Sequence, residues 1–365
     1  MLLKEGQVFL SNYKNGLATF IVLLLGFIPV IAQDTHEDFM FRDKIQPVDE
    51  SNIFRSEDYF NWGGSIIKGD DNQYHLFYSR WPRDTKFTGW LVYSEVAHAV
   101  SASPSGPWTY KETVLKGRGK GYWDAITAHN PKIKYFEGKY YLYYISTNLG
   151  DNIAYSEEEL LETSLTGYTH SNWKILRPNQ RTGVAVANSL SGPWERMDTP
   201  LIEPSGPITT LTVNPAIDRG KDGKYYLIVK GDKPNDTNFT RNQALAIGNH
   251  PAGPFVIQDQ PVIDYMDTED MSLWYDDLRG KYFGIFHAHT FIGLVSSDDG
   301  IHWDKNEEFE IMPKEIPMKK GGELNPDRME RPNVYRENGD IQVLLLACKK
   351  GNDSFIVTIP IKPSK

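Results

Sequence analysis

The sequence predicts an all-β protein, specifically a five-bladed β-propeller with a central axial pocket. Short runs of Tyr, Val, Ile, Leu and Phe, bounded by Gly, Pro, Asp and Asn, predict strands along most of the 365 residues, of which 13% are aromatic. A hairpin motif and a Gly-Pro-aromatic turn recur at matched distances, and such self-similarity is typical of repeat architectures. Radial repetition buries both faces of each small sheet, which explains strands that are aromatic-rich rather than strictly alternating.

The repeated hairpin places the blades in order along the chain. Its five copies, the last of them degenerate, cover residues 71–78, 138–144, 223–228, 280–285 and 338–344. The second motif follows the first four copies, at residues 103–108, 189–194, 250–255 and 297–303. Each unit therefore reads as two strands joined by a Gly turn, a third strand, the Gly-Pro-aromatic turn and an outer strand. A β-sandwich with similar hairpins is the alternative, but the paired motifs favour the propeller.

The N-terminus predicts export. We interpret residues 1–32 as a secretory signal peptide, because an apolar run at 17–32 follows Lys4 and Lys14; a single membrane anchor is the alternative. Residues 33–54 are then an N-terminal extension, and residues 55–365 form the catalytic propeller domain. The expected location is periplasmic or secreted.

Charge and cysteine content exclude several classes of partner. Removing Lys4, Lys14 and Glu5 with the signal leaves 37 basic and 47 acidic side chains, from 39 and 48 in the whole chain. Such an acidic surface predicts no nucleic-acid partner and no membrane binding once the signal is cleaved. Cys348 is the only cysteine, so an internal disulfide is impossible and stability must come from packing.

The blade motif resembles a known group of enzymes. The Asn-Pro-x-Ile and Gly-Lys-Tyr-Tyr-Leu-Tyr-Tyr pattern, followed by Ser-x-Ser-Gly-Pro-Trp, is similar to five-bladed propeller glycoside hydrolases of families 43, 32, 62 and 117. The resemblance covers nearly all of residues 55–360 and assigns no single family. It implies an axial funnel in which acidic side chains from several blades surround one sugar. The residues that would line this funnel open the inner strands, at 62–65, 129–131, 213–215, 268–271 and 330–332.

The chain departs from that group at two carboxylate positions. Families 43 and 32 place a carboxylate at the entry of the first blade, where this chain has Gly63 and Gly64, and family 43 has Asp where this chain has Lys132. Family 117, in which a histidine is thought to act as the acid, is nearer. The missing first-blade carboxylate must be replaced elsewhere or be absent.

Three acids are the predicted catalytic residues. Glycoside hydrolysis needs a protonated group at the leaving oxygen and a carboxylate that activates water or attacks carbon. Glu269 and Glu330 open the fourth and fifth inner strands, and Asp124 lies on the approach to His129. The alternatives are capping acids on a solvated rim and, for Asp124, a loop carboxylate that accepts from backbone amides.

The remaining candidates would bind substrate. Trp62 or Trp81 would stack on a sugar, and the histidines and charged side chains at blade ends would contact its polar groups. Only one of two alternating histidines in the fourth blade can face the pocket, and the alternative for all of them is packing within the propeller. The full set comprises Trp62, Arg80, Trp81, His129, Asn130, Asn214, Lys230, Asp232, Asp270, His287, His289 and Arg331.

These observations predict an exo-acting glycoside hydrolase that releases a terminal sugar from a poly- or oligosaccharide, with inversion implied by the resemblance. We expect no cofactor and no metal site, although a central-channel ion is compatible with the fold. An insertion at 156–172 in the second blade is long enough to wall one side of the pocket or to make an oligomer contact. A non-catalytic carbohydrate-binding propeller and a structural propeller for protein partners are the alternatives. The sequence does not predict the oligomeric state.

Overall fold

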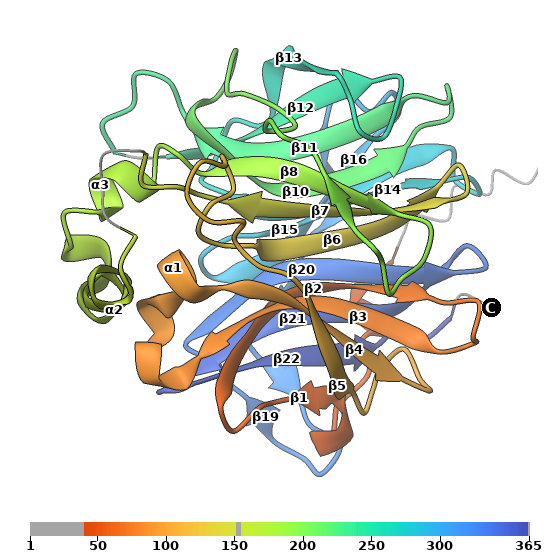
Figure 1. Ribbon diagram of the computed structural model, residues 1–365. Helices are drawn as coiled ribbons and strands as arrows, with labels where there is room; N and C mark the ends of the chain where they lie inside the picture. Colours follow the sequence, from red (N-terminus) through yellow and green to blue (C-terminus); the bar gives the residue numbers. More distant parts are fainter. Residues whose placement is uncertain (1–39, 151–154, 239, 364–365) are drawn as a thin grey trace, which may run out of the picture. The chain divides into compact units, whose positions relative to one another are not determined.

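Five four-stranded antiparallel sheets are arranged around one axis, as Figure 1 shows. The computed structural model describes residues 40–150, 155–238 and 240–363, so the signal peptide expected at 1–32 lies outside the described residues. The predicted all-β, five-bladed propeller is confirmed. No helix among the described residues has the length and apolar character that crossing a membrane would require.

Each blade runs from an inner strand at the axis to an outer strand at the rim. Blade I contains β2 (Tyr59–Lys68), β3 (Tyr74–Pro82), β4 (Glu95–Ser101) and β5 (Thr109–Leu115); blade II contains β6 (His129–Phe136), β7 (Lys139–Ser146), β8 (Arg181–Ala187) and β9 (Glu195–Arg196). Blade III contains β10 (Thr209–Arg219), β11 (Tyr225–Asp232), β12 (Arg241–Gly248) and β13 (Phe255–Ile263); blade IV contains β14 (Glu269–Asp276), β15 (Lys281–His287), β16 (Phe291–Ser297) and β17 (Asp304–Pro313). Blade V contains β20 (Arg328–Glu337), β21 (Asp340–Lys350), β22 (Asp353–Pro360) and β1 (Ile53–Phe54), and a small hairpin of β18 (Ile316–Pro317) and β19 (Glu323–Leu324) precedes it. The helices are α1 (Trp90–Tyr93), α2 (Glu157–Thr166) and α3 (Trp173–Leu176), with short 3-10 turns at Arg42–Lys44, Glu50–Asn52, Arg83–Thr85, Phe87–Gly89 and Gly167–Thr169.

The two ends of the described chain meet in blade V. β1 pairs antiparallel with β22, with Ile53 opposite Val357 and Phe54 opposite Ile356. The propeller therefore includes two residues before the predicted boundary at 55, and Phe41 and Val48 are fully buried in the apolar cluster shared by blades IV and V. Because the first strand completes the last blade, backbone hydrogen bonds close the ring of sheets.

Every inner strand has the same irregularity where it enters the axis. The pairing of each inner strand with its neighbour shifts register after its first residues. At the shift, one residue per blade has a left-handed backbone, with φ between 40° and 66°, namely Gly63, Asn130, Asn214, Asp270 and Arg331. Asparagine and aspartate tolerate this conformation better than most residues, which is a physical reason for the repeated Asn-Pro of blades II and III.

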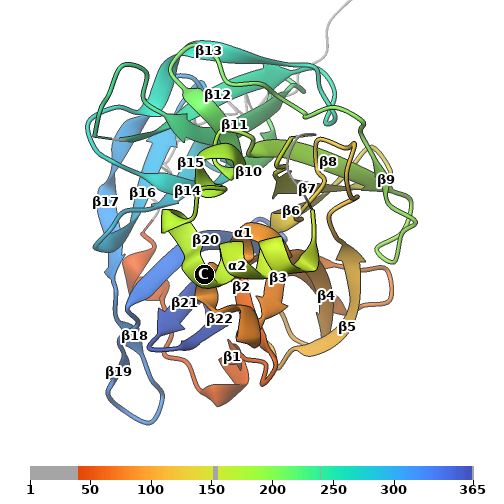
Figure 2. The same ribbon diagram turned by 60° about the vertical axis from the view of Figure 1, so that its left-hand side comes forward.

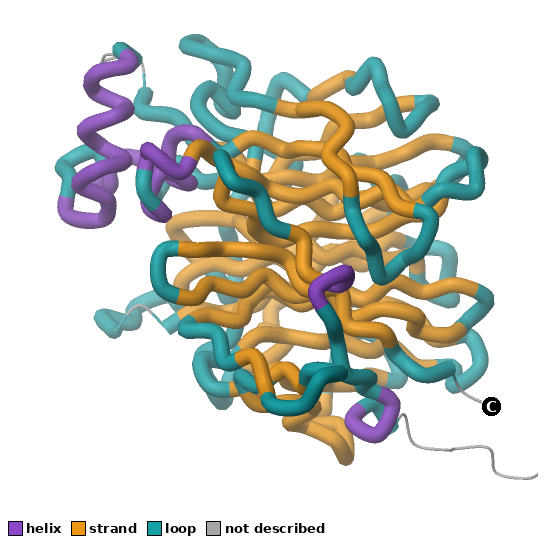
Figure 3. Tube along the Cα trace, turned by 90° about the horizontal axis from the view of Figure 1, so that it is seen from below, coloured by secondary structure: helices purple, strands orange, loops and turns teal. Residues whose placement is uncertain are grey.

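The insertion of blade II contains the helix α2. Ser156 caps α2 by accepting from the backbone N–H of Glu159 at 3.2 Å, and three glutamates occupy the first turn, where the helix dipole favours negative charge. The insertion reaches blade I, because Thr88 and Lys86 donate to the backbone oxygens of Ser164 and Leu165. In Figure 2, α1 and α2 lie in front of the ring of blades, and Figure 3 shows α2 beyond the ends of the strands.

Candidate active site

A cavity of about 310 Å³ lies at the end of the axis that carries the helices. We call it the helix-side cavity. It brings together five predicted site residues, Glu269, Glu330, Asn214, Lys230 and Arg331. Its other polar and aromatic lining comes from residues that the sequence reasoning missed, namely Trp90, Tyr168, Trp173, Arg177, Gln180, Arg241 and Arg328.

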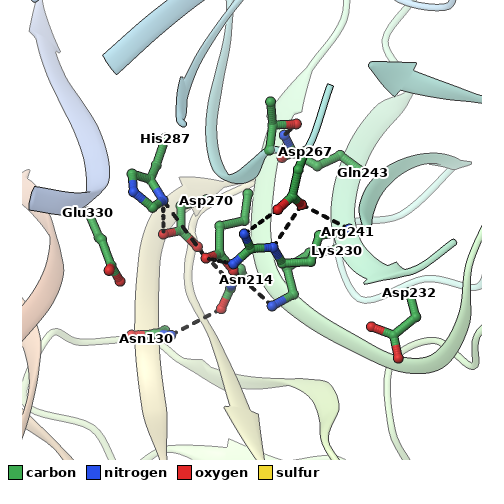
Figure 4. Close-up of polar contacts among 12 residues, drawn as sticks. Asn130, Asn214, Lys230, Asp232, Arg241, Gln243, Asp267, Asp270, His287 and Glu330 are labelled. Carbon is green, nitrogen blue, oxygen red and sulfur yellow. Dashed lines mark hydrogen bonds and ion pairs between the residues drawn. The ribbon is translucent and has the colours of Figure 1, made fainter. Parts of the chain in front are cut away.

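Glu269 is a buried carboxylate held by two cations from blade III. Lys230 Nζ donates to its Oε2 at 2.8 Å and Arg241 Nη1 donates to its Oε1 at 2.7 Å. Both cations are labelled in Figure 4. Burial alone would raise the pKa of Glu269, but the charges of Lys230, Arg241 and Arg331 outweigh it and hold the pKa well below its usual range. Glu269 is therefore ionised at neutral pH, a state that suits a base or a nucleophile.

The left-handed residues of blades II to V form an axial ring, of which Asn214 and Arg331 also line this cavity. Asn214 Nδ2 donates to Asp270 Oδ1 at 2.7 Å, and Arg331 Nη1 donates to the same oxygen at 2.5 Å. The amide of Asn130 lies 3.0 Å from Asn214 Oδ1, and in its other orientation its oxygen accepts from both terminal nitrogens of Arg331 at 3.0 and 3.1 Å. We use the name axial ring for Asn130, Asn214, Asp270 and Arg331.

Gly63 occupies the fifth position of the ring without a side chain. A Cβ there would lie 3.2 Å from Arg331 Cγ and 3.2 Å from Asn130 Oδ1. The space that a first-blade carboxylate would need is thus taken by the stem of Arg331. This protein thus lacks the first-blade carboxylate and has the side chain of Arg331 next to that position.

Asp270 differs electrostatically from its neighbour Glu269. Burial raises the pKa of Asp270, the charge of Arg331 opposes this effect, and the negative charge of Glu269 reinforces it. The result is a raised pKa for Asp270 beside a lowered pKa for Glu269. Adjacent acids with pKa values pushed apart are typical of sites that move protons, so this pair is a candidate for such chemistry.

Glu330 is the second acid in the lining. Arg328 binds it in two places, with Nε 2.6 Å from Oε1 and Nη2 3.1 Å from Oε2. A neighbouring cavity of about 40 Å³ also touches Glu330 and is lined by the predicted residues Trp62, Trp81 and His129. Their rings pack mainly on protein, because all three are at most 3% exposed.

His287 lies under the two acids of blade IV. Its Nδ1 is buried, 3.8 Å from both Glu269 Oε1 and Asp270 Oδ2, and has no hydrogen-bond partner among the described residues. The ligand atoms of these three residues lie close enough together to hold a metal ion. The surroundings do not fit one, because Glu269 and Asp270 already pair with Lys230, Arg241 and Arg331, and an added cation would face these three positive charges against two carboxylates.

Several predicted residues serve the site indirectly. Asp232 forms a bidentate ion pair with Arg177 at 2.5 Å and so fixes a cation of the lining. His289 is largely exposed; its Nε2 lies 3.1 Å from Asp267, the residue that also anchors Arg241. Neither Asp232 nor His289 lines the cavity.

Asp124 and Arg80 lie away from the cavity. Asp124 is fully buried, pairs with Arg118 at 2.5 Å and Arg196 at 3.1 Å, and accepts from Tyr144. Arg80 pairs with Glu95 at 2.8 Å, and its guanidinium lies between the rings of Tyr59 and Tyr110. Asp124 was predicted from its proximity in sequence to His129 and Arg80 from its place at the end of a strand, whereas both side chains are occupied by structural partners.

The connection between β7 and β8 supplies several residues of the helix-side cavity that the sequence did not single out. Tyr168 belongs to the insertion predicted at 156–172 to wall the pocket, and Trp173 and Arg177 follow directly after it, before β8. Trp90 stacks on His129, with ring centroids 5.2 Å apart. Arg241 and Arg328 are the first residues of their strands, a position that could have marked them as axial candidates.

Comparison with known proteins supports the fold. No family model matches the sequence, and no curated protein matches it. The protein BT0996, solved as an RGII complex, is 13% identical, with a TM-score of 0.61 over 89% of this protein and 93% of the other. Zg3597, a family 117 glycoside hydrolase from the marine bacterium Zobellia galactanivorans, is 16% identical, with a TM-score of 0.57 over 87% and 89%.

A third match is a family 43 β-xylosidase/α-arabinofuranosidase from a compost metagenome, solved with xylotriose. It is 12% identical, with a TM-score of 0.55 over 88% of this protein and 93% of the other. The predicted resemblance to this group is thus confirmed in three dimensions. The chain has the five-bladed propeller fold of glycoside hydrolases of families 117 and 43.

Proposed function

We propose that this protein is a glycoside hydrolase that releases a terminal sugar from a poly- or oligosaccharide. The observation that carries the proposal is a buried, ionised carboxylate, Glu269, facing the same axial cavity as a second acid, Glu330. The shared fold of enzymes that act on sugars supports the choice of substrate class, and a carbohydrate is accordingly the expected partner.

The two acids divide the chemistry. Glu269 stays charged because Lys230 and Arg241 surround it, so it acts as the base that activates water or as the nucleophile. Glu330 is the proton donor to the leaving oxygen.

The shape of the cavity supports action at a chain end. Its volume of about 310 Å³ is at the small end of ligand pockets, and Tyr168 and Trp173, from the connection between β7 and β8, line one side. Cleavage within a chain would need a long groove, whereas this site is a compact cavity. Inversion rests on the family resemblance, and NMR of the first-formed anomer would test it.

Substitution of Glu269 is the direct test of the function. Glu269→Gln should lower kcat by about 10²–10⁴-fold, because the amide cannot act as a base or nucleophile, while sugar binding persists. Glu95→Gln is the matched control, since it removes another buried carboxylate from an arginine pair, outside the cavity. Hydrolysis of a glycan panel at full rate by a folded Glu269→Gln protein would reject the assignment.

A non-catalytic sugar-binding propeller is the second candidate. Gly63, where related families carry a carboxylate, favours it. Saturable binding of a glycan in the helix-side cavity, with no product across the panel, would select this candidate over the hydrolase.

We also propose that the protein works outside the cytoplasm. The support is the apolar run at 17–32 with lysines before it. N-terminal sequencing of the protein recovered from fractionated cells tests this, with a mature terminus near residue 33 expected and an intact cytoplasmic protein as the contrary result.

A further inference from the structure

A second cavity of about 230 Å³ lies on the other side of the axial ring. We call it the turn-side cavity, because its lining comes from the later residues of all five inner strands, near the hairpin turns. Its polar lining comprises Ser65, Lys132, Lys134, Asp218, Ser272, Asn333 and Arg336. Between the two cavities, the axial ring and Lys132 enclose only about 10 Å³, the space of about one water, so the cavities are separate.

The turn-side cavity has an excess of positive charge. Three cations line it, Lys132, Lys134 and Arg336, but Asp218 is the only carboxylate in its described lining. Asp218 pairs with Lys134 at 3.3 Å. Arg336 donates to the backbone oxygens of Tyr275 and Gly339, and its Nε is buried without a partner within the described part of the chain.

Compared with the turn-side cavity, the helix-side cavity has better-paired cations in its described lining. There, every cation of the lining has a carboxylate partner: Arg177 pairs with Asp232, Lys230 and Arg241 with Glu269, Arg328 with Glu330, and Arg331 with Asp270. Lys132 and Arg336 have no such partner among the residues that the structure describes. Unpaired cations that are partly shielded from water are costly, so a complementary anion among them would be stabilised.

Lys132 stands at the inner end of this cavity. Lys132 is partly exposed because it lines the turn-side cavity, and it also borders the small space at the axial ring. Burial lowers the pKa of Lys132 to about 7; Asp270 opposes the shift, and Arg331 and Lys134 reinforce it. Its amine is thus only partly protonated at neutral pH. An anion nearby would favour the ammonium form, so anion binding should draw in a proton.

We propose that the turn-side cavity binds a tetrahedral oxyanion, either free phosphate or sulfate or the same group carried on a sugar. Lys132, Lys134 and Arg336 supply charged donors, and the hydroxyl of Ser65 supplies a neutral one. The volume, several times that of a water molecule, leaves room for the anion with hydrating water or with an attached sugar. This site is independent of the hydrolytic proposal, because the axial ring separates the two cavities.

Isothermal titration of the folded protein with sulfate, inorganic phosphate and glucose 6-phosphate tests the site. We expect one saturable site, and the relative affinities of the free and sugar-borne anions tell which source fits. With sulfate, which does not titrate near neutral pH, binding at pH 7 should take up protons, and this uptake should fade at lower pH, where Lys132 is already charged. Absence of saturable binding of all three probes at millimolar concentration would overturn the proposal.

Variants of Lys132 test most directly whether its side chain binds the anion. Lys132→Met should weaken binding by about ten-fold or more, because one charge-assisted donor is lost, whereas Lys132→Arg should retain binding. Lys224→Met, at an exposed lysine outside both cavities, is the control and should bind as the parent does. Lys132→Met should also be at least as stable as the parent without anion, so equal binding by a folded Lys132→Met protein would refute the site.

Discussion

Glu269 owes its charge to residues of a different blade. Lys230 lies on β11 and Arg241 on β12, both in blade III, whereas Glu269 begins β14 of blade IV. Its position at a blade entry could be predicted from the repeated motif. Its ionisation could not, because the cations that cause it are 39 and 28 residues away in sequence.

Removing Lys230 should change the pH dependence of hydrolysis. A base must be ionised, so activity is lost as the pH falls through its pKa. Lys230→Met takes away a charge that lowers the pKa of Glu269, so the acid limb of the kcat/KM profile should move to higher pH. Lys224→Met, an exposed lysine with an aspartate partner, should leave the limb in place. An active Lys230→Met enzyme with an unmoved limb would contradict the role of Glu269.

A side chain at Gly63 should destabilise the protein. Its φ is 40° and an added Cβ would press on Arg331 and Asn130, so Gly63→Ala should lower the free energy of unfolding. Gly351→Ala is a matched control, with φ of 59° and open space around the new Cβ. In urea denaturation, Gly63→Ala should cost about 1–2 kcal/mol more than the control. If both variants lose the same free energy of unfolding, the axial ring does not require a glycine at position 63.

At the scale of elements, the connection between β7 and β8 supplies part of the lining of the helix-side cavity. Trp173, in α3, lines the helix-side cavity, and Leu161, in α2, points to solvent with 42% of its surface exposed. Trp173→Ala should raise KM by about ten-fold with a smaller effect on kcat, because it removes a sugar-stacking surface rather than a reacting group. Leu161→Ala should match the parent enzyme. An unchanged KM in Trp173→Ala would remove the insertion from the substrate site.

The elements that could be predicted from the sequence are those with local signals. The hairpins follow from their Gly turns, and α2 follows from its Ser156 cap and early glutamates. The direction of each inner side chain does not follow, because the register shift at each entry interrupts the alternation of faces. Asp124 shows the same limit in a loop, since its partner Arg196 is 72 residues away and only the fold brings them together.

At the scale of the whole molecule, β1 holds the ring closed. Phe54 packs in the cluster of blades I and V, and its ring lies 5.1 Å from that of Tyr78. Phe54→Ala should lower the free energy of unfolding by about 3–5 kcal/mol in a single cooperative transition, because the first and last blades share this contact. Tyr135→Ala, at a ring that is 55% exposed, should cost little. A small loss for Phe54→Ala would mean that closure of the ring contributes little to stability.

The central claim is that a terminal sugar is cleaved between Glu269 and Glu330 in the helix-side cavity. Its most direct test is a crystal structure of the Glu269→Gln protein with a glycan that the parent enzyme cleaves. The account predicts an intact terminal glycoside in that cavity, with its glycosidic oxygen beside Glu330 and Trp173 against a sugar ring. A glycan bound elsewhere on the propeller, with the cavity free of sugar, would contradict it.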